Sequence, residues 1–102
     1  MKRALRASIF LGEDDTFEHR PRYHEIVSRA RKAGLAGATV LRGVEGYGAS
    51  SLIHTTRLLS LAEGLPVVVI LVDSDEKVRG FVRDNAALLA DATVVADEVE
   101  VL

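Results

Sequence analysis

The stretch PVVVILVD, Pro66–Asp73, is the most apolar segment of the chain and predicts a strand that is buried on both faces. A sheet that carries helices on one face normally alternates apolar and polar residues along each strand. Here every residue from Val67 to Val72 is apolar, so the second face also needs a cover. We expect another copy of the chain to provide it, because large exposed apolar patches are rare on soluble monomers. A neighbouring side chain or a long loop is the alternative cover.

Before this strand, the sequence predicts a strand, a polar loop, a helix and a second strand. The alternation over residues 5–11 has the period of a strand, and GEDDTFEHRPR, residues 12–22, follows as a polar loop. Pro21 suits the first turn of a helix, and Gly34 suits its end. The apolar stripe of this helix consists of Tyr23, Ile26, Val27 and Ala30. The second strand covers Gly37–Glu45.

After Pro66–Asp73, the sequence predicts a second helix and a last strand. The helix covers residues 73–91 and begins at Asp73 or Ser74, since either side chain can cap it. Gly80 in its interior weakens it by ~1 kcal/mol relative to alanine. The apolar face of the helix consists of Val78, Phe81, Val82, Asn85, Leu88 and Leu89. In the last strand, one face carries Val95, Val99 and Val101 and the other carries Glu98 and Glu100.

The order of these elements, β-α-β-β-α-β, predicts a ferredoxin-like α+β fold. We expect residues 1–102 to form a single domain with one antiparallel sheet in the order 4-1-3-2. Both helices should cover the same face of that sheet.

The distribution of charge bears on both partners and topology. The net charge of −2 argues against a nucleic-acid-binding protein, which usually has a basic face. Residues 1–33 hold eight Lys and Arg against five Asp and Glu, whereas residues 73–102 hold three against eight. We therefore expect Lys2, Arg3 and Arg6 to lie near Glu98 and Glu100 on a neighbouring strand. A solvated acidic end is the alternative.

Cysteine and hydropathy patterns indicate the compartment. The chain has no cysteine, so neither disulfides nor thiolate metal sites are available. It also has no apolar run of the ~20 residues that a membrane-spanning helix needs. We expect a cytoplasmic protein without direct membrane insertion.

The connection between the second and third strands covers residues 46–65, far more than the two to five residues of ordinary hairpin loops. It begins within LRGVEGYGASS, Leu41–Ser51, which holds three glycines. Glycine allows a ligand to approach backbone N–H groups, and nearby hydroxyl and basic side chains add donors. The segment therefore predicts a site for a phosphate or another small anion. Its expected residues are Arg42, Gly43, Gly46, Tyr47, Gly48, Ser50, Ser51, His54 and Arg57.

Other interpretations of these residues are weaker. The glycine spacing fits neither a Walker motif nor a dinucleotide fingerprint, so a flexible bend is the alternative to an anion site. Tyr47 suits either stacking on a base or contact with a protein partner. The three histidines lack the spacing of a metal site, and the carboxylates of residues 13–15 are typical of a polar turn. No catalytic constellation is visible, so we expect a sensor without a cofactor and not an enzyme.

Three long blocks resemble the domain-of-unknown-function family 190, a PII-like family: IFLGEDD, RPRYHEIVSRARKAGLAGATVLRGVEGYGASS and IHTTRLLSLAEGLPVVVILVDSDEKV. The resemblance runs from Leu5 to Val101. It implies ferredoxin-like subunits in a homotrimer, with residues 46–65 as a T-loop that contacts a transporter, channel or enzyme. It also implies that a small effector, typically an adenine nucleotide, binds in the cleft between subunits.

One departure concerns the segment before the last strand. PII proteins have a second glycine-rich, basic loop there, whereas this chain reads LLADATV, with Asp91 and no glycine or lysine. A ligand with less charge than ATP is therefore favoured. The expected function is that of a PII-like trimeric signalling protein with a small anionic effector. The alternatives are a CutA-like protein that binds divalent metal and a small enzyme on the same fold.

Overall fold

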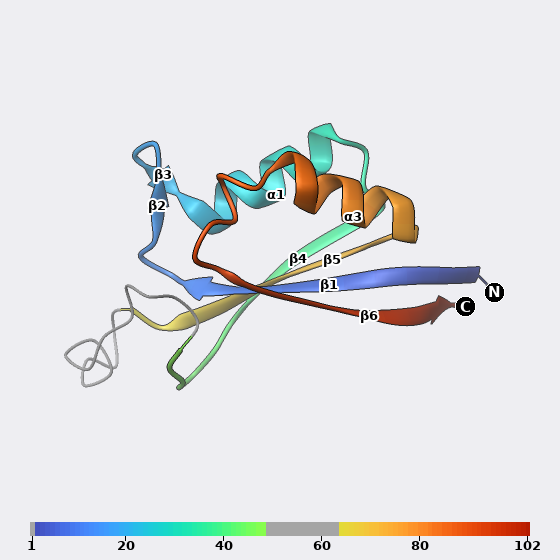
Figure 1. Ribbon diagram of the computed structural model, residues 1–102. Coiled ribbons are helices and arrows are strands. Elements are labelled where there is room, and N and C mark those ends of the chain that lie inside the picture. Colours follow the sequence, from blue (N-terminus) through green and yellow to red (C-terminus); the bar gives the residue numbers. More distant parts are fainter. Residues whose placement is uncertain (1, 49–63) are drawn as a thin grey trace.

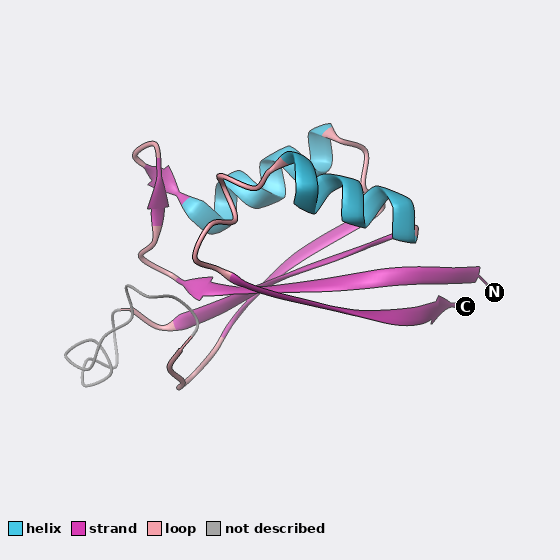
Figure 2. Cartoon of the chain, in the orientation of Figure 1, coloured by secondary structure: helices cyan, strands magenta, loops and turns pink. Residues whose placement is uncertain are grey.

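A four-stranded antiparallel sheet with two helices on one face makes up the computed structural model, which describes residues 2–48 and 64–102 (Figures 1 and 2). Its strands are β1 (Lys2–Gly12), β4 (Gly37–Arg42), β5 (Pro66–Asp73) and β6 (Thr93–Val101), and its helices are α1 (Arg22–Lys32) and α3 (Asp75–Asp84). The spatial order is β4-β5-β1-β6. Counted over these four strands, this is the expected order 4-1-3-2. The expected α+β, ferredoxin-like arrangement is confirmed.

Helix α1 ends where the sequence predicts, and it begins at Arg22, directly after Pro21 instead of with Pro21 in its first turn. Pro21 is its N-cap, and the helix ends at Ala33 as the C-cap. Gly34 follows with a φ of +80°, a conformation that glycine adopts without strain. The N–H groups of Gly34 and Leu35 bond to the carbonyls of Arg31 and Ala30, which is the hydrogen-bond pattern of a Schellman motif.

Helix α3 begins as expected but is shorter. The Ser74 hydroxyl caps it by accepting a hydrogen bond from the Lys77 N–H at 3.2 Å. The prediction of a helix up to residue 91 is wrong beyond Asp84. Asn85 ends the helix as its C-cap, since its backbone leaves the helical conformation with φ −116° and ψ 34°, and its side-chain amide donates to the Phe81 carbonyl. Leu88 and Leu89 are nevertheless buried, in the turns that follow the helix. The apolar pattern therefore predicts correctly that these residues are buried but not that they are helical.

Residues 12–22 are more ordered than the expected polar loop. They include a small hairpin of β2 (Thr16–Phe17) and β3 (Arg20–Pro21). Glu18 and His19 form its turn with positive φ values of 51° and 68°. The hairpin escapes detection because its strands have two residues each, too few to show a period.

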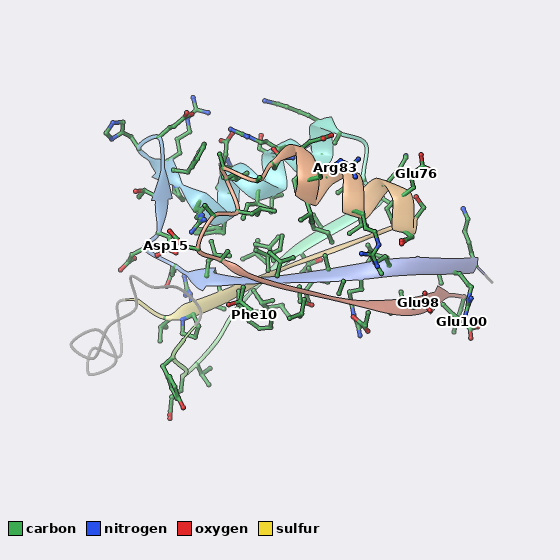
Figure 3. The ribbon with its side chains drawn as sticks, in the orientation of Figure 1. Phe10, Asp15, Glu76, Arg83, Glu98 and Glu100 are labelled. Carbon is green, nitrogen blue, oxygen red and sulfur yellow. The ribbon has the colours of Figure 1, made fainter. Side chains whose placement is uncertain are left out.

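The two faces of the sheet differ in their cover. On the helix side, side chains of β1 and β5 are buried against α1, α3 and the turns after α3: Leu5, Ala7, Ile9, Leu11, Val67, Val69 and Leu71. On the opposite side, which we call the open face, Val68, Ile70 and Val72 are half-buried and Phe10, Leu41, Val95 and Val101 are exposed. Figure 3 shows Phe10 on the side of the sheet away from the helices. Within the described chain, nothing covers this apolar face.

The charged ends of the chain pair as expected. β6 lies antiparallel beside β1, with Arg3 opposite Glu100. The Arg3 guanidinium is 3.9 Å from the Glu98 carboxylate. Arg6 binds Asp97 at 2.7 Å instead of either glutamate, because these two residues are opposite each other in the register. This hydrogen bond holds the pKa of Asp97 below its ordinary value. In the described part of the chain, no helix has the length and apolar character to cross a membrane.

Candidate functional site

The expected glycine segment lies at the end of the sheet opposite the chain termini, where β1 and β4 end and β5 begins (Figure 1). Of the predicted site residues, the structure describes Arg42, Gly43, Gly46, Tyr47 and Gly48. The others, Ser50, Ser51, His54 and Arg57, lie outside the described residues, as does most of the connection over residues 46–65. The anion site as a whole therefore stays a prediction, and the described half of it can be examined in detail.

Gly43 is required by close packing against the first residue of β5. Its N–H donates to the Pro66 carbonyl at 2.7 Å. A Cβ atom at position 43 would lie 2.9 Å from Cγ of Pro66, closer than real Cβ contacts. Because the Gly43 N–H already donates to Pro66, it is not available to a ligand. Its hydrogen bond joins the residue after β4 to the first residue of β5.

Gly48 has a different reason to be glycine. Its φ is +83°, and no atom of residues 2–48 and 64–102 lies within 4 Å of the position where a Cβ would be built. The backbone there is open to approach from outside, which is the property that the sequence predicts for a ligand-binding glycine.

Arg42, the last residue of β4, pairs with Glu13 through its Nη2 atom and the Oε2 atom of the carboxylate. The arginine side chain is 63% exposed, whereas the glutamate side chain is 20% exposed. The sequence identifies Arg42 as a cation for a ligand but misses this internal partner. The two residues are 29 positions apart, and only the sheet topology brings them together.

The acidic run Glu13–Asp15 is more than a polar turn. The Glu13 N–H donates to the Leu65 carbonyl at 2.8 Å, and the Asp14 carboxylate accepts from the Gly64 N–H at 3.1 Å. Both bonds hold the residues that immediately precede β5. With the Glu13–Arg42 pair, the run contacts the chain on both sides of the long connection.

Asp15 anchors this run in the interior, and Figure 3 places it where β1 leads into the small hairpin. Its carboxylate accepts a hydrogen bond from the Gly12 N–H and lies 3.6 Å from the Arg22 guanidinium. Arg22 in turn donates to the carbonyls of Leu88 and Ala90, in the segment before β6. No pattern in the sequence predicts this buried pair.

A hollow of about 330 Å³ opens beside the glycine segment at the edge of the open face. Two aromatic side chains border it, Phe10 and the largely exposed Tyr47. Its other lining residues include Pro66, Val68, Thr93 and the three glycines. The lining is mainly apolar, so the hollow suits a flat ring system more than a phosphate group.

The remaining candidates do not gather into a site. His19 and His24 are exposed on the small hairpin and on α1. Within residues 2–48 and 64–102, no group of three or more histidine, aspartate or glutamate side chains is placed to hold a metal ion. Asp91, in the position that is basic in PII proteins, is exposed with a φ of +67°.

The close contact at Gly43 gives a stability prediction. Gly43→Ala should lower the free energy of unfolding by about 1–3 kcal/mol, because the added methyl group overlaps the Pro66 ring. Gly37→Ala, at the other end of β4, is the control, because a Cβ there meets no atom of the described residues within 4 Å. Urea denaturation of both variants measures the difference, and equal stabilities would contradict the packing argument.

Comparisons with known proteins agree on family and fold. The family model DUF190, described as "Uncharacterized ACR, COG1993", matches residues 4–101. A "UPF0166 protein" of Aquifex aeolicus (strain VF5) is 38% identical over 101 residues, which is 99% of this chain and 93% of that protein. "UPF0166 protein MJ1524" of Methanocaldococcus jannaschii is 33% identical over 79 residues, which is 78% of this chain and 72% of that protein.

Among solved structures, CPII of Thiomonas intermedia K12, bound to ADP, AMP and acetate, has a TM-score of 0.67. It is 14% identical, and the match covers 99% of this chain and 90% of CPII. A putative PII-like signaling protein of Thermus thermophilus (TTHA0516) has a TM-score of 0.60 and 18% identity, over 100% of this chain and 94% of that one. At these identities the likeness shows the fold, which is PII-like.

Proposed function

The chain belongs to the uncharacterised family DUF190, and from its PII-like fold we propose that it is a trimeric signalling protein. Its effector is a small anion, most simply an adenine nucleotide, bound at the boundary between subunits. The segment over residues 46–65 serves as the T-loop through which the effector state reaches a transporter, channel or enzyme in the cytoplasm. The protein senses its ligand and does not transform it.

The observation that carries this proposal is the position of the hollow. It lies at the edge of the apolar open face, with Phe10 and Val68 common to both. A copy of the chain that covers the open face would also close the hollow, and ligand binding and assembly would then share a boundary. Aromatic side chains such as Phe10 and Tyr47 offer stacking surfaces for a purine ring.

CPII supports the ligand class, since it has been solved with ADP and AMP. In the present chain, the cation nearest the glycine segment among the described residues is Arg42, and Asp91 replaces a basic loop. A nucleotide with one or two phosphates therefore fits this site better than ATP.

Calorimetric titration with AMP, ADP, ATP and inorganic phosphate tests the proposal. ADP and AMP should bind more tightly than ATP. Arg42→Ala should weaken ADP binding about ten- to a hundredfold, since a hydrogen bond to a charged group is typically worth about 1.5–3 kcal/mol. Gly48→Val should weaken it by closing the approach to the backbone. Arg31→Ala, an exposed residue in the last turn of α1, is the control with the same loss of charge. The proposal fails if no nucleotide binds at millimolar concentration.

A further inference from the structure

We infer that Glu13 is an internal competitor of the anionic effector for Arg42. In the absence of ligand the carboxylate neutralises the guanidinium, and the effector must displace it. This inference rests on the proposed function, since it concerns the regulation of the same site. It assigns a role to a residue that the sequence predicts only as part of a polar turn.

The exposures of the two side chains support this assignment. Arg42 reaches out from the end of β4 with most of its surface in water, while Glu13 is largely covered. An anion that approaches from solvent meets the guanidinium and the carboxylate together. A phosphate beside Glu13 is repelled by its like charge, so binding at Arg42 and pairing with Glu13 oppose each other.

The backbone of Glu13 connects this competition to the other side of the long connection. The Glu13 N–H holds the Leu65 carbonyl, and the neighbouring Asp14 carboxylate holds the Gly64 N–H. Displacement of the Glu13 side chain therefore removes one contact of a turn that also holds the residues leading into β5. When Glu13 leaves Arg42, the turn also loses its side-chain contact with β4, because Arg42 is the last residue of that strand.

The buried contacts of Asp15 keep the turn in place when the Glu13 side chain moves away from Arg42. Asp15 is buried and bonded to the Gly12 N–H, beside the buried Arg22. The Glu13 side chain can leave Arg42 while the turn itself stays in place. The Arg42 guanidinium can therefore bind either Glu13 or the effector, and binding of one excludes binding of the other.

Glu13→Gln tests the inference, because glutamine keeps the size of the side chain and removes its charge. ADP should bind this variant about two- to fivefold more tightly than it binds the wild-type chain, the range that an exposed ion pair of up to about 1 kcal/mol allows. The gain should shrink at high salt. Glu18→Gln, in the exposed turn of the small hairpin, is the control with the same change in net charge.

Two further measurements separate competition from a general charge effect. In the Arg42→Ala background, Glu13→Gln should bring no gain, since the shared cation is gone. Without ligand, the Gly43 amide should exchange its hydrogen several-fold faster in Glu13→Gln, because the neighbouring end of β4 has lost its contact with Glu13.

The outcomes distinguish this inference from the proposed function. If the wild-type chain binds ADP through Arg42 but Glu13→Gln binds it no more tightly, the competition is overturned and the proposed function stands. If the wild-type chain binds ADP through Arg42 and Glu13→Gln binds it more tightly, both are supported. If neither ADP nor inorganic phosphate binds either protein, both are overturned.

Discussion

Val68→Lys should give a folded monomer, whereas Val69→Lys should prevent folding. The two residues are neighbours in β5, and successive side chains of a strand point to opposite faces. Val69 is fully buried in the core under the helices. A lysine there loses its hydration without gaining a partner, and for the charged form this costs on the order of tens of kcal/mol, more than the ~5–15 kcal/mol stability of a small domain.

Val68 lies on the open face, where Phe10 and Leu41 are its cross-strand neighbours. A lysine at this position can reach water in a single chain but not under a second copy of the apolar face. Light scattering should therefore give the mass of three chains for the wild type and of one chain for Val68→Lys, with unchanged circular dichroism. Ala87→Lys, exposed in the turns after α3, should remain a trimer.

Persistence of the trimer in Val68→Lys would show that the open face is not the assembly surface. A wild-type chain that is monomeric at micromolar concentration would overturn the trimer itself. In that case the apolar hollow beside the glycine segment would also lack its proposed second wall, so the result bears directly on the effector site.

The sequence predicts the sheet well because its strands carry long periodic signals. The alternation in residues 5–11 matches the burial of one face of β1, and the unbroken run from Val67 to Val72 puts apolar side chains on both the core face and the open face of β5. Val95, Val99 and Val101 share the open face, as the pattern indicates, whereas Val94 packs against the core. The charge asymmetry predicts that β1 and β6 are neighbours, and oppositely charged side chains of these two strands do form ion pairs.

Helix ends and tight turns cannot be predicted from periodic patterns where tertiary contacts determine them. Leu88 and Leu89 continue the apolar spacing of α3 but are buried from turns, because Asn85 ends the helix before them. The hairpin turn at Glu18 and His19 uses positive φ in residues that rarely adopt it. Neither feature leaves a periodic trace in the sequence.

The sequence predicts which residues belong to the candidate site but not which contacts they make. The glycine segment is found from its residue types, yet the reason for Gly43 is a proline that begins a distant strand. Arg42 is recognised as a cation, yet its partner Glu13 comes from the end of β1. Such contacts depend on which strand ends meet, and this follows only once the sheet order is known.

Arg22→Met should lower the free energy of unfolding by about 3–5 kcal/mol, the range for breaking a buried ion pair by removing one partner. The Arg22 side chain is 9% exposed and lies beside the Asp15 carboxylate, whose side chain is 5% exposed. It also donates to the Leu88 carbonyl at 2.7 Å and to the Ala90 carbonyl. Methionine retains much of the volume, so the loss would measure the polar contacts and not a cavity.

Three variants give the matched comparison in urea denaturation. Arg20→Met removes an exposed arginine, which lies 3.5 Å from Glu25, and should change stability by less than about 1 kcal/mol. Asp15→Asn keeps an acceptor for the Gly12 N–H and should lower stability less than Arg22→Met. The double variant Arg22→Met with Asp15→Asn should be more stable than the sum of the single effects predicts, because the carboxylate that Arg22→Met leaves buried is then neutral.

The same pair links the acidic run Glu13–Asp15 to the segment before β6. Arg22 holds the carbonyls before β6, and Asp15 belongs to the acidic run that binds Arg42 and Gly64. Arg22→Met should therefore also increase hydrogen exchange at the Gly64 amide under conditions where the chain stays folded. If the Gly64 amide and the stability both remain at their wild-type values, the buried pair is dispensable and Asp15 does not anchor the run. An effect on stability alone would confine the role of Arg22 to joining the segment before β6 to α1.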